Sequence, residues 1–258
     1  MIAPLLEGFM QLVLICALGV GGATALGAVL GFIFKDISHR ISDLVLAFAA
    51  GVMLASAIYG LLTPSLELGG KHGVLITIIG IFAGSLSLNA IDKLIPHAHK
   101  YVEKGDMPEQ IRRRRVILFV VAVAMHNLPE GIAAGVGFGS GDLSSALFIA
   151  GGIAIQNVPE GMVIISPMVS VGISPAKALF IALLTGAVEV VGTVLGYFAI
   201  TISHAILPFA LAFAGGTMLY VISDEIIPDT HADGVENGAT YALLTGFCLM
   251  LLFNSLLS

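Results

Sequence analysis

The sequence predicts an all-α integral membrane protein with eight transmembrane helices, in a 3+2+3 arrangement with inverted repeats. Three observations lead to this fold class. The chain is 57% hydrophobic and 11% charged, whereas soluble domains carry about 25% charged residues. Eight apolar stretches are long enough to cross a bilayer, which takes roughly 20 residues each. One nine-residue segment also recurs with seven of its nine residues unchanged, in stretches that would cross in opposite directions.

The predicted spans form a single transmembrane domain over residues 1–258. They cover about residues 10–34, 43–63, 73–95, 115–138, 145–168, 177–200, 205–227 and 239–257. The first span has no basic segment before it and is long enough to cross, so we expect a retained helix rather than a cleaved signal peptide. Cys16 and Cys248 both fall in apolar spans, which argues against a disulfide framework.

Basic residues predict the orientation. Lys100, Lys104 and the run from Arg112 to Arg115 lie between the third and fourth spans. Because Lys and Arg are enriched in cytoplasmic loops, residues 96–114 are expected to form a cytoplasmic loop. Both termini then lie outside, and only Lys71 among the basic residues falls on the outer side. The net charge of −6 and the few, locally clustered basic residues give no reason to expect a nucleic-acid partner.

An internal repeat supports inverted topology. The segment Leu-Ala-Phe-Ala-Ala-Gly-Val-Met-Leu at 46–54 in the second span matches Leu-Ala-Phe-Ala-Gly-Gly-Thr-Met-Leu at 211–219 in the seventh. Inverted-topology repeats are found in many transporters. Spans one to three would then pair with spans six to eight, leaving four and five as a central unit. Chance similarity between two small-residue helices is the alternative.

Two polar motifs interrupt the fourth and fifth spans. They read His-Asn-Leu-Pro-Glu-Gly at 126–131 and Gln-Asn-Val-Pro-Glu-Gly at 156–161. Residues four apart share a helix face, so His126 lies with Glu130, and Gln156 with Glu160. Asn127 and Asn157 lie about 100° round the helix, which suits a second, adjacent site. Imidazole, carboxylate and carboxamide donors fit a divalent transition metal such as zinc. A polar contact between helices is the alternative.

Charge and depth strengthen the metal hypothesis. Glu189 lies near the middle of the sixth span, at the depth expected for Glu130 and Glu160, with no Lys or Arg at that depth. Three charged, unpaired carboxylates there would cost on the order of 8–10 kcal/mol. A bound dication or protonation would have to neutralise them. Met53, midway along the second span, is either a soft thioether ligand or ordinary packing.

A second polar tier ends the third and seventh spans. Its carboxylates and histidines are candidates for a relay that carries metal out of the site, with ordinary interfacial polarity as the alternative. The candidate relay residues are Asp92, His97, His99, Asp224, Glu225 and His231.

With these motifs the chain resembles the ZIP (Zrt/Irt-like) family of divalent metal transporters, in particular its bacterial GufA-like branch. The resemblance implies eight helices in a 3+2+3 arrangement with inverted repeats, and both termini outside. It also implies a binuclear centre. The first site would use Met53, His126, Glu130, Gln156 and Glu160. The second would use Asn127, Asn157 and Glu189, with Glu130 and Glu160 bridging. Many members have His where Gln156 stands, and some have Asp where Asn157 stands.

The sequence therefore predicts a transporter that imports zinc, with iron, manganese and cadmium as further candidates, by alternating access. A bacterial inner membrane is the expected location, the bilayer and the metal are the expected partners, and a homodimer is left open. A passive metal-selective channel is the first alternative. An intramembrane metalloenzyme is the second, but neither the His-Glu-x-x-His signature nor a serine nucleophile elbow is present. We therefore expect no enzyme activity and no catalytic cofactor.

Overall fold

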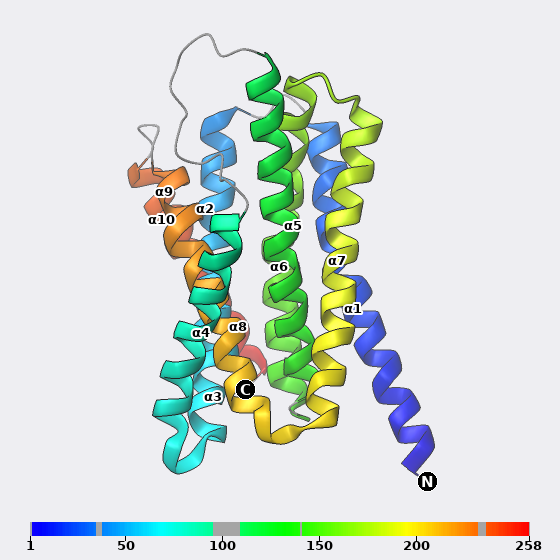
Figure 1. Ribbon diagram of the computed structural model, residues 1–258, viewed down its shortest axis with the longest axis vertical. Coiled ribbons are helices and arrows are strands. Elements are labelled where there is room, and N and C mark those ends of the chain that lie inside the picture. Colours follow the sequence, from blue (N-terminus) through cyan, green and yellow to red (C-terminus); the bar gives the residue numbers. More distant parts are fainter. Residues whose placement is uncertain (1, 35–37, 95–108, 140, 232–235, 258) are drawn as a thin grey trace.

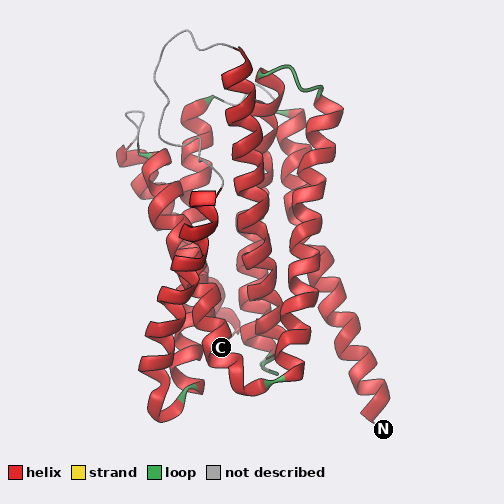
Figure 2. Ribbon diagram, in the orientation of Figure 1, coloured by secondary structure: helices red, strands yellow, loops and turns green. Residues whose placement is uncertain are grey.

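The computed structural model describes residues 2–34, 38–94, 109–139, 141–231 and 236–257, and every regular element in these ranges is helical (Figure 2). The α-helices are α1 (Ile2–Ile33), α2 (His39–Ala55), α3 (Thr63–Leu68), α4 (Gly73–Leu94), α5 (Glu109–Gly139), α6 (Leu143–Ser170), α7 (Pro175–Ile202), α8 (Leu207–Val221), α9 (Ile227–Thr230) and α10 (Glu236–Leu257). Two π-helical segments, η1 (Ser56–Leu62) and η4 (Ile222–Ile226), and two 3₁₀ turns, η2 (Gly70–His72) and η3 (His204–Ile206), complete the described elements.

Eight helical stretches in the described ranges are long and apolar enough to cross a membrane, which confirms the predicted all-α, eight-span fold class. The second span joins α2, η1 and α3, and the seventh joins α8, η4 and α9. Helix α5 begins at Glu109, inside the segment predicted as a loop. In Figure 1, α2 and α5 begin at the upper end of the molecule and α6 begins at the lower end. We use these two names below.

The π-helical segments were not predicted, and each ends two residues before a proline. Pro64 and Pro228 have no N–H, and their rings would clash with the carbonyl four residues earlier. The turn before each proline widens instead, so the Thr63 N–H bonds to the Ile58 carbonyl and the Ile227 N–H bonds to that of Ile222, both five residues back. The prolines inside α5 and α6 have no such effect, and both helices continue through them.

The eight spans form two bundles. Helices α1, α5, α6 and α7 make the first, in which α1 packs on α6 and α7, and α5 packs on α7. Helices α2, α4, α8 and α10 make the second, in which α4 packs on α8 as α10 packs on α2. This correspondence fits the internal repeat. The fourth and fifth spans do not stand apart as a central pair, because they join the first and sixth. We call these units the α5–α6 bundle and the α2–α8 bundle.

Small residues let helices within the α5–α6 bundle approach closely. A Cβ atom at Gly27 or Gly31 of α1 would collide with the backbone of Val158 or Met162 on α6. Close backbone approach through small residues is how membrane helices pack without a hydrophobic driving force between them. The polar motifs lie on α5 and α6, two helices of this closely packed bundle.

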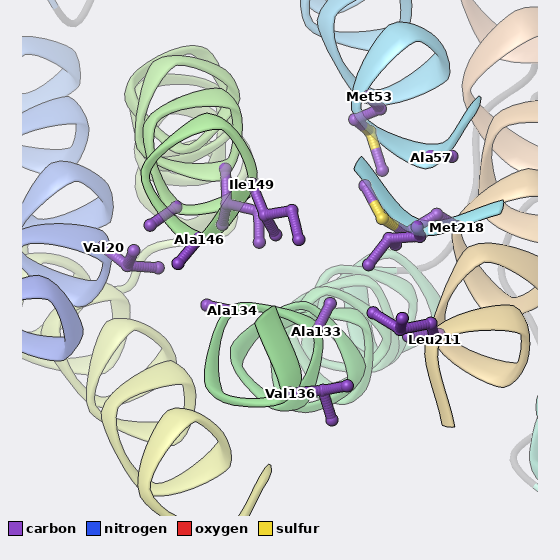
Figure 3. Close-up of a cluster of buried hydrophobic side chains, with 14 of the residues drawn as sticks. Val20, Met53, Ala57, Ala133, Ala134, Val136, Ala146, Ile149, Leu211 and Met218 are labelled. Carbon is purple, nitrogen blue, oxygen red and sulfur yellow. The ribbon is translucent and has the colours of Figure 1, made fainter. Parts of the chain in front are cut away.

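The two bundles meet in the lower half along an apolar cluster (Figure 3). Its side chains are small or aliphatic and fully or almost fully buried. They include Met53, Ala57, Ala133, Ala134, Ile149, Leu211 and Met218. We call this cluster the lower seal. Met53 and Met218 occupy equivalent positions in the internal repeat and lie near each other in Figure 3.

Candidate metal centre

Helices α5, α6 and α7 bring the polar residues of the predicted centre together near mid-height of the α5–α6 bundle. All are buried except Glu160, which is half-buried. Helix α5 supplies His126, Asn127 and Glu130, helix α6 supplies Gln156, Asn157 and Glu160, and helix α7 supplies Glu189.

Glu189 receives hydrogen bonds from three neighbouring helices. Its Oε1 accepts from Asn127 Nδ2 at 2.5 Å and from Thr24 Oγ1 at 2.7 Å, and its Oε2 accepts from Asn157 Nδ2 at 2.5 Å. Charge neutralisation by a metal or a proton was predicted for all three carboxylates. At Glu189 three neutral donors replace part of the water that burial removes, and charge neutralisation stays a prediction for all three groups.

By comparison, Glu130 accepts one hydrogen bond from the side chains that the structure describes. Gln156 Nε2 donates to its Oε1 at 2.8 Å. Since an ionised carboxylate only accepts hydrogen bonds, each amide turns its nitrogen toward its carboxylate and its oxygen away. The two motifs are therefore linked to each other and to α7 through their amide nitrogens. Their amide oxygens accept no hydrogen bond from the described residues.

Five buried oxygens of this cluster have no hydrogen-bond partner within the described part of the chain. They are Asn127 Oδ1, Glu130 Oε2, Gln156 Oε1, Asn157 Oδ1 and Glu160 Oε1. Leaving a buried acceptor unsatisfied costs about 1–3 kcal/mol each, and more for a charged group. Two carboxylate and three amide oxygens form a donor set for a divalent cation. A cation among them would satisfy the oxygens that the protein itself leaves without partners.

His126 points away from the amide network. Its Nε2 lies 3.0 Å from Oε1 of Glu225, on η4 of the α2–α8 bundle. Both side chains line a cavity of about 70 Å³ together with Glu130, Glu160 and Asp229. A space of this size holds several water molecules. Because Asp229 is exposed near the upper end, the cavity leads from the polar cluster toward that surface.

Met53 lies in the lower seal, 1% exposed, and does not line this cavity. Among the described residues, no three His, Cys, Asp or Glu side chains stand in a geometry that would hold a metal ion by themselves. Binding through these residues therefore needs the amide oxygens, or rotation of carboxylates that now accept hydrogen bonds.

The candidate relay residues are placed differently from one another. Glu225 lines the cavity, whereas Asp224 is exposed and does not. The ring of His231 lies 2.9 Å from the Ile227 carbonyl and 3.3 Å from Thr240 Oγ1, which fixes it near the upper end. His97 and His99 lie outside the described residues, as does the side chain of Asp92.

Three residues near the centre were missed. Thr24 bonds to Glu189, Asp229 lines the cavity, and Met218 lines a smaller pocket beside His126 and Glu130. The repeat was a usable signal for Met218, because it stands where Met53 stands in the other half. No local pattern identifies Thr24.

These features define a class, the multi-pass membrane proteins that hold a buried cluster of carboxylate, amide and imidazole groups midway along their helices. A family model described as "ZIP Zinc transporter" matches residues 99–254. The chain belongs to the ZIP family.

Similar proteins cover nearly the whole chain. The zinc transporter GufA of Myxococcus xanthus is 37% identical over 93% of this chain and 97% of that protein. The zinc transporter ZIPB of Bordetella bronchiseptica is 36% identical over 91% of this chain and 78% of its own length. Zinc transporter ZIP11 of Homo sapiens is 30% identical over 89% of this chain and 92% of its own length. The predicted membership of the family, and its GufA-like branch, is confirmed.

Proposed function

We propose that this protein carries divalent transition metals, zinc first among them, into the cytoplasm. The observation that carries the proposal is the set of five buried oxygens on α5 and α6 that have no hydrogen-bond partner among the described residues. Relatives named as zinc transporters support zinc as the substrate. Iron, manganese and cadmium are further candidates because the donor set is not selective by itself.

In the proposed centre the metal is bound by Glu130 and Glu160 of the two motifs, with His126 and the Gln156 oxygen beside them. Asn127, Asn157 and Glu189 form a second site that shares Glu130 and Glu160. Met53 joins the first site only if the lower seal rearranges, because it now packs among apolar side chains.

The proposed mechanism is alternating access by movement of the α5–α6 bundle against the α2–α8 bundle. Six of the seven polar ligands come from α5 and α6, and the seventh from α7, so the cluster can move as one unit. In the lower half, the side chains at the contact between the two bundles are small or aliphatic. Sliding along such a surface breaks few polar contacts, and transport by movement of one part of a repeat against the other is known among secondary transporters.

The proposed orientation puts the upper end in the cytoplasm, both termini outside and the chain in a bacterial inner membrane. Arg40, Lys177 and the exposed residues Arg112 to Arg114 begin helices at the upper end, and Lys71 lies at the lower end. The cavity beside His126 would then be the route of release, through Glu225 and Asp229. The bilayer contacts and a homodimer stay predictions.

A passive channel is the rival in the same class. A channel needs a continuous path, whereas the lower seal closes the region between the bundles in this structure. Zinc uptake into proteoliposomes separates the two. In a carrier, uptake of labelled zinc saturates as the zinc concentration rises, and it speeds up when unlabelled zinc is present inside the proteoliposomes. In a channel, unlabelled zinc inside does not accelerate the flux of labelled zinc. Lack of any zinc uptake by folded, reconstituted protein would contradict both.

A further inference from the structure

Thr24 of α1 is a donor to Glu189 that belongs to neither polar motif. It is 2% exposed, and its Oγ1 lies 2.7 Å from Glu189 Oε1, although the two residues are 165 positions apart. A threonine inside a helix usually bonds a carbonyl of its own preceding turn. Thr185, Thr193 and Thr217, all equally buried, do so. The Thr24 hydroxyl is directed across to another helix instead.

The packing of α1 explains how so short a side chain reaches α7. A Cβ atom at Gly186 of α7 would collide with the backbone of Gly21, and one at Gly161 of α6 with the backbone of Thr24. The three helices therefore approach at a single level, with α1 held against α6 and α7. Only this backbone proximity brings the hydroxyl within hydrogen-bond distance of the Glu189 carboxylate.

The Thr24 hydroxyl belongs to a hydrogen-bond network that holds the whole Glu189 carboxylate. Glu189 Oε1 is shared by Thr24 and Asn127, and Oε2 is bound by Asn157. With the carboxylate held, both amide nitrogens face it and both amide oxygens face away, buried and without a partner among the described residues. The direction of the two amide oxygens thus depends on the angle at which Glu189 is held.

We infer that Thr24 is a positioning residue for metal binding: its hydroxyl holds Glu189, and through Glu189 it orients the oxygens of Asn127 and Asn157 toward the cation. The inference rests on the proposed metal transport and adds to it a residue from the first span. Preorganised ligands bind more tightly because less ordering is left to occur on binding.

The test compares three variants of the purified full-length protein by zinc titration calorimetry. Thr24→Val keeps the shape and removes the donor, and it is expected to weaken zinc binding by about tenfold, as for a lost hydrogen bond to a charged group. Thr24→Ser keeps the donor and should bind within about twofold of the wild type. Thr185→Val is the matched control, since the Thr185 hydroxyl donates to the Ala182 carbonyl of its own helix, and this variant should bind zinc as the wild type does.

A second comparison separates positioning from general packing. In a Glu189→Ala background, Thr24→Val should change the zinc Kd by less than about twofold, because the hydroxyl acts through the carboxylate. If Thr24→Val does not fold, Thr24→Ala removes the donor without adding a methyl group in its place.

Three results would overturn the inference: wild-type affinity in a folded Thr24→Val protein, equal weakening in Thr24→Ser, or an undiminished effect without Glu189. Absence of zinc binding by the wild-type protein would remove the proposed function itself. Intact wild-type binding without a Thr24 effect would remove the inference alone.

Discussion

The upper and lower halves of the contact between the bundles are built from equivalent parts of the repeat, yet they differ in chemistry. In the upper half, η4 brings Glu225 to His126 beside a cavity of about 70 Å³. In the lower half, η1 has the sequence Ser-Ala-Ile-Tyr-Gly-Leu-Leu, without a carboxylate, and packs into the lower seal. A separate cavity of about 140 Å³, lined by Glu67, Asp142 and Ile149 among others, lies below the seal.

The difference shows that equivalent segments of the repeat border the polar cluster with unlike chemistry. Small apolar residues close one end by packing, whereas a cavity lined partly by His126, Glu225 and Asp229 leads toward the other end. The polar cluster of the α5–α6 bundle lies between the two, so in this conformation it communicates with the upper end.

Glu130→Ala is expected to have the largest effect. It removes a carboxylate that faces both the cavity and the Gln156 amide, and zinc uptake into proteoliposomes should fall about 100-fold or more, by analogy with the loss of several kcal/mol on removing a buried charged partner. Glu236→Ala, an exposed carboxylate at the start of α10, is the matched control and should transport normally. Near-normal uptake by a folded Glu130→Ala protein would refute the assignment of the cluster.

Acidification should weaken zinc binding by about tenfold per pH unit for each proton that the metal displaces, because protons and metal compete for the same carboxylate oxygens. Competition by protons is reversible, unlike loss of the folded protein at low pH. Zinc binding should therefore recover when the pH is raised again. Calorimetry in two buffers of different ionisation enthalpy measures the protons released. A zinc Kd that does not change between mildly acidic and neutral pH would contradict the direct competition.

Glu225→Gln should have a smaller effect, about five- to tenfold on the zinc uptake rate, with little change in zinc Kd. The amide still fills the space beside His126, but it attracts the departing cation less strongly, since one charge beside the cavity is lost. Asp224→Gln is the control, because Asp224 is exposed and does not line the cavity. Equal effects of the two substitutions would show that general charge, rather than the cavity wall, matters.

Ile149→Ala should change stability and leave affinity almost untouched. Ile149 is 1% exposed in the lower seal, and its truncation should lower the free energy of unfolding by about 2–5 kcal/mol. Thermal unfolding in detergent measures this loss, and zinc calorimetry should give a Kd within about twofold of the wild type. A large change in Kd would show that the lower seal and the polar cluster are not independent.

Much of the fold follows from the sequence because a bilayer allows few alternatives. Only helices and closed barrels satisfy their backbone groups in lipid, and apolar stretches of about 20 residues have the length of a spanning helix, so they predicted the eight spans. The spacing within the two motifs likewise predicted which side chains share a face. The grouping of the spans did not follow, because nothing local states that α5 and α6 pack with α1 and α7.

Some features near the site did not follow from the sequence, for physical reasons. The π-helical segment η4 shifts the helical phase, so regular counting did not show that Glu225 faces the cavity and Asp224 the surface. Met53 packs in the lower seal, where a flexible apolar side chain fits as well as a ligand would. The role of Thr24 could not be predicted from the sequence, because its partner Glu189 is 165 residues away. Only the close packing of small residues brings the two side chains together.

The most direct test of the central claim is the position of bound metal in crystals grown with zinc or cadmium. Anomalous scattering is expected to show a strong peak between α5 and α6, within coordination distance of Glu130 and Glu160, and a second peak beside Asn127, Asn157 and Glu189 if both sites fill. Peaks confined to exposed carboxylates such as Asp224 and Glu67, with none in the buried cluster, would contradict the account.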